Sequence, residues 1–281
     1  MEYIKHYEKI FSELNNSTDN KLKEDSFNFF SKGGFPIKKK GNERWKYLDL
    51  RSLEQTLYAT DYENDNINLN LNDFGLSDLN SVLVKNGVPK YENINGIDAM
   101  PYQSYIPIIN YDEDEFISLN SSMSSKPLLL KVNSSYNKNV LNIMYISESD
   151  KEILECPRIF IEVDSGVEVT INEVFLGSET KTLKLPVTEI KLLEGSRVFH
   201  NLAFQSSFNE NNFKFTRVDQ KEDSFYKFTS FSNSSLLAAN DIKVSLNGKN
   251  SECDLKGIYF TTLNSQFNTH VVVDHNVPYT K

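Results

Sequence analysis

Apolar and polar residues alternate along most of the second half of the chain, which is the period of a β-strand with one buried face. Helical periodicity nearly disappears after Lys126-Pro127, where the composition also changes. The pattern therefore predicts a mainly β region over residues 126–281. Its candidate strands lie at residues 128–132, 140–146, 158–163, 167–175, 183–193, 198–204, 213–218, 225–231 and 242–246.

A weak repeat runs through this region. Gly166 and Gly195 are separated by nearly the same interval as Ser196 and Ser224, and Glu252 follows Ser224 at that interval again. Each of these corners opens a strand, and a second strand follows before the next corner. A repeat of this length favours a β-solenoid, in which each coil buries its inner face against the next. A β-sandwich also spaces its strands regularly and stays open as an alternative on the period alone.

Residues 240–281 continue the strand pattern, interrupted by Asn247-Gly248, by Gly257 and by a predicted turn at Asp274-His275-Asn276. The β-branched run Val271-Val272-Val273 lies just before that turn. If the strands stack as a solenoid, the last rung has no further strand to cover it. We therefore expect a partner, a continuation or a cap at this end.

The first part of the chain has the period of α-helices. Residues 2–14 place apolar side chains on one helical stripe and charged side chains on the other face. A second helix is predicted to start near Asp19 and to end at Gly33-Gly34, where a left-handed cap is favourable. The side chains it is expected to bury are Leu22, Phe27, Phe29 and Phe30.

Three further elements precede the β region. Residues 81–88 predict a strand that enters a tight turn, residues 112–122 predict a short capped helix, and the Asn- and Asp-rich residues 60–80 predict a loop. The sequence thus predicts an α-rich N-terminal domain with a short β element at residues 1–125. A β-helix core, incomplete at its C-terminal end, follows at residues 126–281.

The composition narrows the classes of partner. A net charge of −9 and a pI near 5.1 argue against binding to nucleic acid or to anionic lipid. The amino terminus has no hydrophobic signal core and no apolar run reaches the length of a membrane span, so we expect a cytoplasmic protein without a membrane contact. The two cysteines, Cys156 and Cys253, allow no disulfide framework and are expected to be reduced.

The sequence has no motif of a nucleotide or metal site. It contains no G-x-x-x-x-G-K-[ST], G-x-G-x-x-G, H-E-x-x-H or C-x-x-C pattern, so we predict no catalytic residues and no tightly bound cofactor. Paired carboxylates of the glycosidase kind are an alternative, because several acidic residues lie on or near strands. They are Glu162, Glu168, Glu173, Asp219, Asp241 and Asp274, and solvated strand faces are their expected place.

The histidines and cysteines provide only weak candidates for metal ligands, namely His200, Cys253 and His275, and we predict no metal site. His200 has the strand parity of Val198 and Leu202, which favours a hydrogen-bonded histidine of the core or of an interface. Cys253 alternates with apolar residues and is expected to be a small buried side chain.

The other histidines and the other cysteine give no ligand set. His270 and His275 face opposite sides of an extended strand and so cannot chelate one ion there. His6 is expected to be solvated on the polar side of the first helix. Cys156, just before a proline, is expected to be exposed in a corner.

The only tryptophan, Trp45, lies among alternating charges. We interpret Trp45 and Tyr47 as anchors of the small domain, and Glu43, Arg44 and Lys46 as solvated residues. A platform for a ligand is the alternative interpretation of this cluster.

Several motifs together resemble the SufD family of iron–sulfur cluster assembly. Gly34-Phe35-Pro36, Lys40, Glu43 and Trp45-Lys46-Tyr47 resemble its amino-terminal signature, and Phe116-Ile117-Ser118-Leu119-Asn120 resembles its F-x-x-L-N motif. Similar segments follow along the chain, from Pro157-Arg158 to Asn172-Glu173, from Leu246-Asn247-Gly248 to Tyr259, and from Thr269-His270-Val271 to Pro278. Leu48 stands where the family has Thr, and Ala239 where it generally has Arg.

The resemblance implies a small helical domain followed by a right-handed parallel β-helix, which favours the solenoid over the sandwich. It implies a non-catalytic scaffold subunit of the SUF system that pairs with SufB at a β-helix edge and holds an iron–sulfur cluster only transiently, in the assembled complex. Family members continue well beyond the position of Pro278, so we expect an apparently truncated chain, with the ATPase SufC bound only through the missing region. The alternatives are a β-solenoid enzyme acting on acidic polysaccharide and a structural β-solenoid adhesin.

Overall fold

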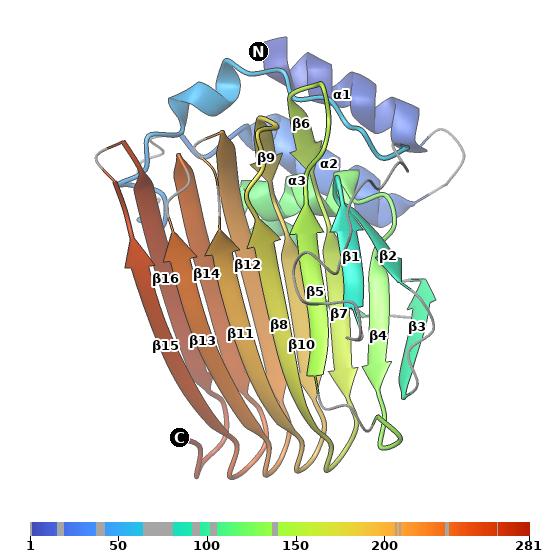
Figure 1. Cartoon of the computed structure of the whole chain (residues 1–281), viewed down its shortest axis with the longest axis vertical. Helices are drawn as coiled ribbons and strands as arrows, with labels where there is room; N and C mark the ends of the chain where they lie inside the picture. The colour runs from blue at the N-terminus through green and yellow to red at the C-terminus, as the bar shows by residue number, and fades with distance from the viewer. Residues whose placement is uncertain are drawn as a thin grey trace.

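The computed structural model describes residues 2–15, 20–37, 43–63, 81–91, 96–101, 106–136, 140–205, 207, 209–233, 236–262 and 264–281. Asp19, Lys40 and most of the predicted loop at residues 60–80 lie outside these ranges. The described residues form a mainly β structure, a solenoid of about five turns with helices at its amino-terminal side (Figure 1). The structure thus confirms the predicted fold class and rejects a sandwich.

Two sheets, made mostly of parallel strands, face each other across the solenoid. Among the described residues, one sheet has the strand order β15-β13-β11-β8-β5-β1-β2, and the other has the order β16-β14-β12-β10-β7-β4-β3. We call them sheet B and sheet A. Sheet B contains β1 (Ser81–Lys85), β2 (Val88–Tyr91), β5 (Val140–Ile146), β8 (Glu168–Leu176), β11 (Arg197–Gln205), β13 (Phe225–Asn233) and β15 (Glu252–Phe260). Sheet A contains β3 (Ile97–Pro101), β4 (Leu128–Val132), β7 (Arg158–Val163), β10 (Val187–Leu192), β12 (Glu210–Gln220), β14 (Leu237–Leu246) and β16 (Gln266–His275), joined by the short β6 (Ile153–Glu155) and β9 (Thr182–Lys184).

The register of sheet B explains the sequence repeat. Glu168 pairs with Arg197, Arg197 with Phe225, and Phe225 with Glu252. The interval between paired positions shortens by one residue from each of these rungs to the next. The predicted repeat of the Ser196–Ser224 interval at Glu252 is therefore wrong by one residue, because the corner equivalent to Ser224 is Ser251. Strands of equal length stack in register although the connecting corners differ in length.

Alternation along each strand separates an inner face from an outer face. In β11 the inner residues Val198, His200, Leu202 and Phe204 are all buried. Aliphatic residues of both sheets fill most of the interior, and polar side chains occupy part of it. Among the described residues this interior is the largest of three hydrophobic cores, and it continues through successive rungs.

Three α-helices precede or interrupt the strands: α1 (Glu2–Asn15), α2 (Lys21–Gly33) and α3 (Glu115–Met123), together with the short 3-10 helices η1 (Leu50–Glu54) and η4 (Tyr111–Glu113). Asn20 caps α2 at its start, and Gly34, at φ 65°, ends it as predicted. Leu22 is exposed and Phe29 only half-buried, so the predicted burial is wrong for these two residues. His6 is not simply solvated, because its Nε2 lies 2.8 Å from the carbonyl oxygen of Tyr58.

A second core joins the helices to the outer face of sheet A. Trp45 packs edge-on against Phe116 of α3 and against Phe213 and Phe215 of β12, and the rings of Phe116 and Phe213 are stacked. The solenoid contributes further apolar residues to the same cluster as the buried side of α1 and α2, namely Leu183, Leu185 and Leu237. The helical layer is therefore packed directly on the solenoid.

Residues before position 126 also extend the two sheets. β1 pairs in parallel with β5, and β3 pairs antiparallel with β4. The predicted domain boundary at residues 125 and 126 stays a prediction. None of the helices in the described part of the chain is long and apolar enough to cross a membrane.

Prolines interrupt two rungs of sheet A at matching places. The predicted strand at residues 183–193 is divided at Leu185-Pro186 into β9 and β10, and Cys156-Pro157 separates β6 from β7 in the same way. The buried side-chain amide of Asn120 donates to the carbonyl oxygens of Pro157 at 2.9 Å and of Leu185 at 2.7 Å. One residue of α3 thus satisfies the backbone of both interrupted rungs.

Replacing Asn120 with Ala should lower the free energy of unfolding by about 1–3 kcal/mol, because the buried Leu185 carbonyl loses this donor and the Pro157 carbonyl keeps only the Val187 amide. Urea denaturation followed by circular dichroism measures this loss. Asn28→Ala, at an exposed position of α2, is the control and should shift stability by less than about 0.5 kcal/mol. A wild-type midpoint for N120A would contradict the assigned role.

Candidate functional site

A buried polar cluster lies between the two sheets. The carboxylate of Glu173, on β8, accepts hydrogen bonds from the Tyr145 hydroxyl at 2.6 Å, the Thr188 hydroxyl at 2.8 Å and the His200 Nε2 at 2.9 Å. The Lys214 ammonium lies 3.0 Å from the same carboxylate. These partners come from β5 and β11 in sheet B and from β10 and β12 in sheet A. The cluster therefore links sheet A to sheet B through the interior of the solenoid.

The charge of Lys214 compensates that of Glu173. Burial raises the pKa of the Glu173 carboxyl, but Lys214, His200 and the Tyr145 hydrogen bond together hold it below its usual value. Burial lowers the pKa of Lys214, and the contact with Glu173 opposes this shift. Glu173 is therefore a carboxylate and Lys214 an ammonium, and each charge stabilises the other in this fully buried site.

His200 has a defined tautomer in this cluster. Its Nε2 faces the Glu173 carboxylate, which only accepts hydrogen bonds, so Nε2 carries a proton. Its Nδ1 lies 2.8 Å from the Tyr226 hydroxyl, which keeps its proton because burial raises the pKa of Tyr226. In the neutral imidazole, this hydroxyl donates to Nδ1. The prediction of a hydrogen-bonded interior histidine is confirmed.

A second interior pair lies towards the helical end of the strands. The Lys184 ammonium is 2.5 Å from Glu210, and both side chains are buried. Burial raises the pKa of neighbouring Glu155 to about 7, while the Lys184 charge opposes the rise. The interior of the solenoid is thus polar as well as aliphatic, and these charges are paired within it.

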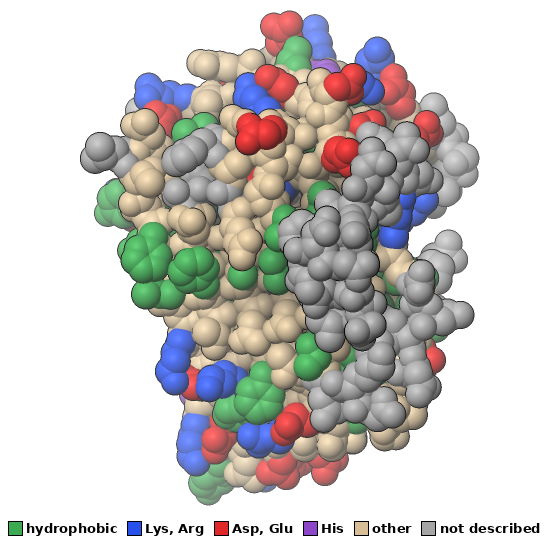
Figure 2. All heavy atoms as spheres, in the orientation of Figure 1, with side chains coloured by type: hydrophobic (Ala, Val, Ile, Leu, Met, Phe, Trp, Pro, Cys, Tyr) green, Lys and Arg blue, Asp and Glu red, His purple; other side chains and the backbone are tan. Residues whose placement is uncertain are grey.

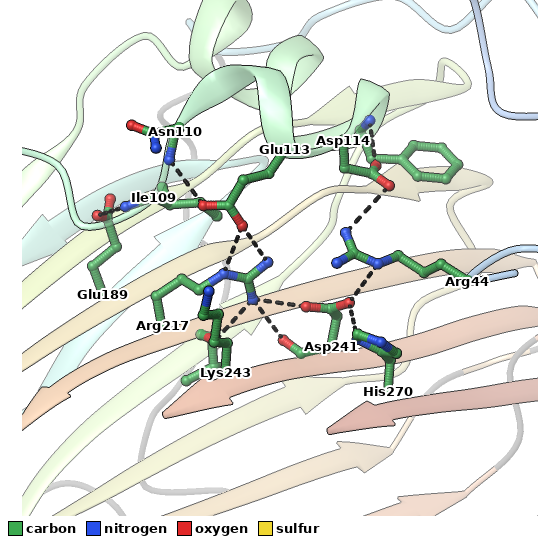
Figure 3. A network of polar contacts seen from close by, with 12 residues as sticks. Arg44, Ile109, Asn110, Glu113, Asp114, Glu189, Arg217, Asp241, Lys243 and His270 are labelled. Atoms are coloured by element: carbon green, nitrogen blue, oxygen red, sulfur yellow. Dashed lines mark hydrogen bonds and ion pairs between the residues drawn. The ribbon is translucent and has the colours of Figure 1, made fainter. Parts of the chain in front are cut away.

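A third cluster lies on the outer face of sheet A, below the helical layer (Figure 3). The Arg217 guanidinium of β12 contacts Asp241 of β14 at 2.7 Å and Glu113 of η4 at 3.1 Å. Asp241 also lies 3.1 Å from the Arg44 Nε and 3.0 Å from the His270 Nδ1 of β16. These contacts link the amino-terminal segment to three successive strands.

Glu189 anchors another part of the same segment. Its Oε2 accepts hydrogen bonds from the backbone amides of Ile108 at 2.6 Å and Ile109 at 3.0 Å. Its Oε1 accepts from the Arg158 guanidinium at 2.8 Å. A carboxylate on β10 therefore holds the chain that leads into η4 and α3 against sheet A.

Asp114 connects the Trp45 motif to α3. Its carboxylate accepts from the Trp45 Nε1 at 2.6 Å and from the Phe116 amide at 2.8 Å, which caps the helix. Burial raises the pKa of Asp114 to about 6, although the Trp45 hydrogen bond and the nearby Arg44 charge act against the rise. This carboxyl therefore titrates closer to neutrality than an exposed aspartate.

The interpretation of the tryptophan cluster is correct for Trp45 and wrong for two of its neighbours. Trp45 is 3% exposed, whereas Tyr47 is 81% exposed and does not anchor the helical layer. Arg44 is not solvated, because it is paired with Asp114 and Asp241. Glu43 and Lys46 form an exposed pair with each other, as expected for surface residues.

The structure places the weak metal-ligand candidates apart. Cys253 is only half-buried on β15, next to Tyr226 on the neighbouring strand, and His275 ends β16 in the other sheet, 2.6 Å from the Thr280 hydroxyl. β16 continues through Asp274 and His275, so the turn predicted there starts later in the chain. Within the described ranges, no three His, Cys, Asp or Glu side chains lie close enough together to hold a metal ion.

Cys156 was expected in an exposed corner, and this expectation is wrong. It is 1% exposed and lies in the core shared by the helices and sheet A. Burial raises the pKa of its thiol well above the usual value, so the thiol is protonated and unreactive.

The expected solvated strand face is wrong for Glu173 and Asp241, whose side chains are buried. The other four predicted acidic residues face lysines or arginines. Glu162 lies between Lys131 at 3.2 Å and Lys191 at 3.0 Å. Partial burial raises the pKa of Glu162, but its hydrogen bonds and ion pairs with these two lysines outweigh burial and lower it overall. Glu162 and Asp219 line a groove of about 560 Å³ on the outer face of sheet A, beside residues 106–108. The remaining pairs are Glu168 with Arg197, Asp219 with Lys221 and Asp274 with Lys243.

One end of the solenoid is mostly open in the described structure. β15 and β16 are the edge strands of their sheets, and the backbone of residues 279–281 hydrogen-bonds around the start of β15, where the Cys253 amide donates to the Lys281 carbonyl oxygen at 2.8 Å. Ile258, Phe260 and Val271, beyond this contact, are each about half exposed. Phe231 of the neighbouring β13 is also exposed. Figure 2 shows hydrophobic side chains gathered at the left of the viewed face, where β13 and β15 lie. Among the described residues, this end carries the largest group of exposed apolar side chains.

Replacing Lys214 with Met should lower the free energy of unfolding by about 3–5 kcal/mol, since Glu173 then remains buried without its cation. Lys256→Met, at a lysine that is 65% exposed, is the control and should change stability by less than about 0.5 kcal/mol. Urea denaturation of both variants measures the difference. Equal midpoints would show that the Glu173 charge does not depend on Lys214.

The raised pKa of Asp114 predicts a defined pH dependence. Between its ordinary value of 3.8 and about 6, the native state binds a proton that the unfolded chain releases, so stability from this group is present at low pH and lost as the pH rises through 6. The difference in free energy of unfolding between wild type and Asp114→Asn should fall by up to about 3 kcal/mol from pH 4 to pH 7. Urea denaturation of both proteins across this pH range measures it. A difference independent of pH would contradict the raised pKa.

Comparison with known families finds a match in the second half of the chain. Residues 145–281 match the family model described as SUF system FeS cluster assembly, SufBD core domain. The match starts at the end of β5 and includes every later strand to β16. No curated protein is similar enough to match the chain. The match supports a role in iron–sulfur cluster assembly by the SUF system.

Proposed function

We propose that this chain is a SufD-like scaffold subunit of the SUF complex, which pairs with a SufB-like subunit through the open end of its solenoid. The observation that carries this proposal is the edge formed by β15 and β16, in a segment that matches the SufBD core domain. The resemblance of the Trp45 and Asn120 motifs to the SufD family favours SufD over other members.

The geometry of the edge suits pairing with another solenoid. An edge strand presents unpaired backbone amides and carbonyls, to which a further strand adds by hydrogen bonding. Here two sheets end together, and their last strands carry partly exposed apolar side chains such as Leu255, Ile258 and Val271. A partner with two matching edges would continue both sheets and cover these side chains.

The scaffold role requires no catalytic group from this chain. Two acidic side chains of the interior, Glu173 and Glu210, are each held by a lysine, and Asp241 on the outer face is held by Arg217. Groups fixed in this way stabilise a framework. The iron–sulfur cluster is the cargo of the assembled complex, and we propose that this chain binds it only there and transiently.

The groove beside residues 106–108 is the feature that a polysaccharide enzyme would use, and its chemistry is unfavourable for that function. A glycosidase needs one carboxylic acid that keeps its proton near neutral pH. Glu162 in the groove has a lowered pKa, because Lys191 and Lys131 outweigh its partial burial. A carboxylate held by two ammonium groups is a poor proton donor, so we retain the scaffold as the proposed function.

Energy for the assembly cycle must come from another subunit in this proposal. The sequence has no phosphate-binding loop motif. We propose that a SufC-like ATPase acts on the pair and that the complex works in the cytoplasm.

Ile258→Asp and Phe260→Asp should each weaken binding to a SufB-like subunit by at least about tenfold, because a charge would enter the apolar edge. Biolayer interferometry with the immobilised SufB-like subunit measures the dissociation constant. Circular dichroism confirms that each variant is folded.

Leu22→Asp is the matched control, since Leu22 is an exposed apolar residue of α2, away from the edge. It should change binding by less than about twofold. Absence of binding by the wild-type chain, or equal loss with L22D, would overturn pairing at this edge.

A further inference from the structure

Strand β16 is held by one neighbour in its sheet and by a segment from the far end of the sequence. Within sheet A it pairs only with β14 among the described strands. Its outer face meets residues 43–55, which we call the strap. The strap lies between α2 and the end of η1 in the sequence and contacts the outer face of the last rungs.

The contacts between the strap and β16 are polar and specific. The side-chain amide of Asn268 donates to the carbonyl oxygen of Arg44 at 2.7 Å, and the backbone amide of Asp49 donates to the Gln266 Oε1 at 2.9 Å. These pairs are separated by 224 and 217 residues in sequence. The contacts therefore join two remote parts of the chain.

The next outward residue of β16 is engaged through an intermediary. His270 contacts Asp241, and the same carboxylate also binds the Arg44 side chain. Figure 3 shows Arg44 and His270 on the same side of Asp241. Three consecutive outward positions of β16, at Gln266, Asn268 and His270, are thus tied to the strap directly or through Asp241.

The strap itself is firmly anchored on its other side. Trp45 is buried and donates to Asp114, while Leu50 and Leu53 of η1 are buried in the helical core. Arg44 is thus fixed between a buried tryptophan and Asp241, whose side chain is 3% exposed. Because the strap is anchored in the helical layer and hydrogen-bonded to β16, it couples the position of β16 to that of the helical layer.

The inner face of β16 is less well supported. Its inward residues Val271 and Val273 are exposed or half-buried, whereas their lateral neighbours on β14, Ile242 and Val244, are buried. Packing alone therefore holds β16 less tightly than it holds the preceding strands, and polar contacts on the outer face weigh more in its local stability.

We propose that the strap is a clasp that keeps β16 ordered and in register, so that the amino-terminal segment controls the state of the terminal edge. Release of the clasp frays β16 and leaves the other rungs intact. Under the proposed function, the clasp determines the fraction of molecules in which the edge is ordered for a partner strand. The clasp itself does not require that function.

Hydrogen exchange of the full chain alone, followed by mass spectrometry, tests the clasp. Asn268→Ala removes the direct hydrogen bond to the strap, and Arg44→Ala releases the strap from Asp241. Each variant should speed exchange in residues 266–275 by about tenfold, because this strand then opens more often. The amides of β10 provide an internal reference.

Lys46→Ala is the matched control within the strap. The Lys46 side chain pairs with the exposed Glu43 and lies over the exposed ring of Tyr47, so it makes its contacts away from β16. This variant should leave exchange in residues 266–275 unchanged.

Two results would overturn the proposal. Exchange in residues 266–275 that is equal in R44A, N268A and K46A would show that the strap does not hold β16. Exchange that rises by the same factor in β10 and β16 would show that the strap contributes only to global stability. Neither measurement requires a partner protein, so the clasp and the proposed pairing with a SufB-like subunit are tested independently of each other.

Discussion

The constraint on which this structure depends is the in-register stacking of parallel rungs. Each side chain has its nearest lateral neighbours on the strands before and after, a full coil away along the sequence. We call the row of side chains at one register position a lane. A polar residue therefore has members of its own lane as neighbours in the adjacent rungs and needs a polar partner among them. The side chains of Asn142, Asn172 and Asn201 form such a ladder at 2.9 Å steps, and a charged one is formed by Lys131, Glu162 and Lys191. Where the polar side chains of a lane pair with one another, each rung determines which side chains fit in the next rung.

The outer side of β12 shows how one strand passes through three surroundings. Phe213 and Phe215 are buried beneath the helical layer, Arg217 belongs to the charged cluster, and Asp219 lines the groove. The change from apolar to charged side chains occurs between Phe215 and Arg217, which share one face. The charged cluster therefore lies at the margin of the helical layer, where burial strengthens ion pairs and neighbouring groups still satisfy each charge.

Local pattern predicted the strands well because each one carries its own alternation. Leu128–Val132, Val140–Ile146 and Arg158–Val163 have the predicted bounds, and the position of His200 followed from strand parity alone. Pairings across the sequence were not predictable in this way. Arg44 has Asp241 as a partner, and nothing near either residue indicates the other. Cys156 was assigned to an exposed corner from its proline, because a single sequence does not show that helices cover that corner.

In a solenoid whose polar lanes are paired internally, the terminal edge is the part that is available for specific recognition. Within the rung stack, ladders on the outer faces are already occupied by their own neighbours, as the pairing of Glu162 and of Asn172 shows. The edge differs, since in the described sheets β15 and β16 pair with a strand on one side only, and on the other side residues 279–281 cover just the start of β15. A following rung, from any source, would find the same lanes and could continue them by the same rules. Because the strap fixes the outer lane of β16 through Gln266 and Asn268, the template offered at this edge is determined by residues from both ends of the chain.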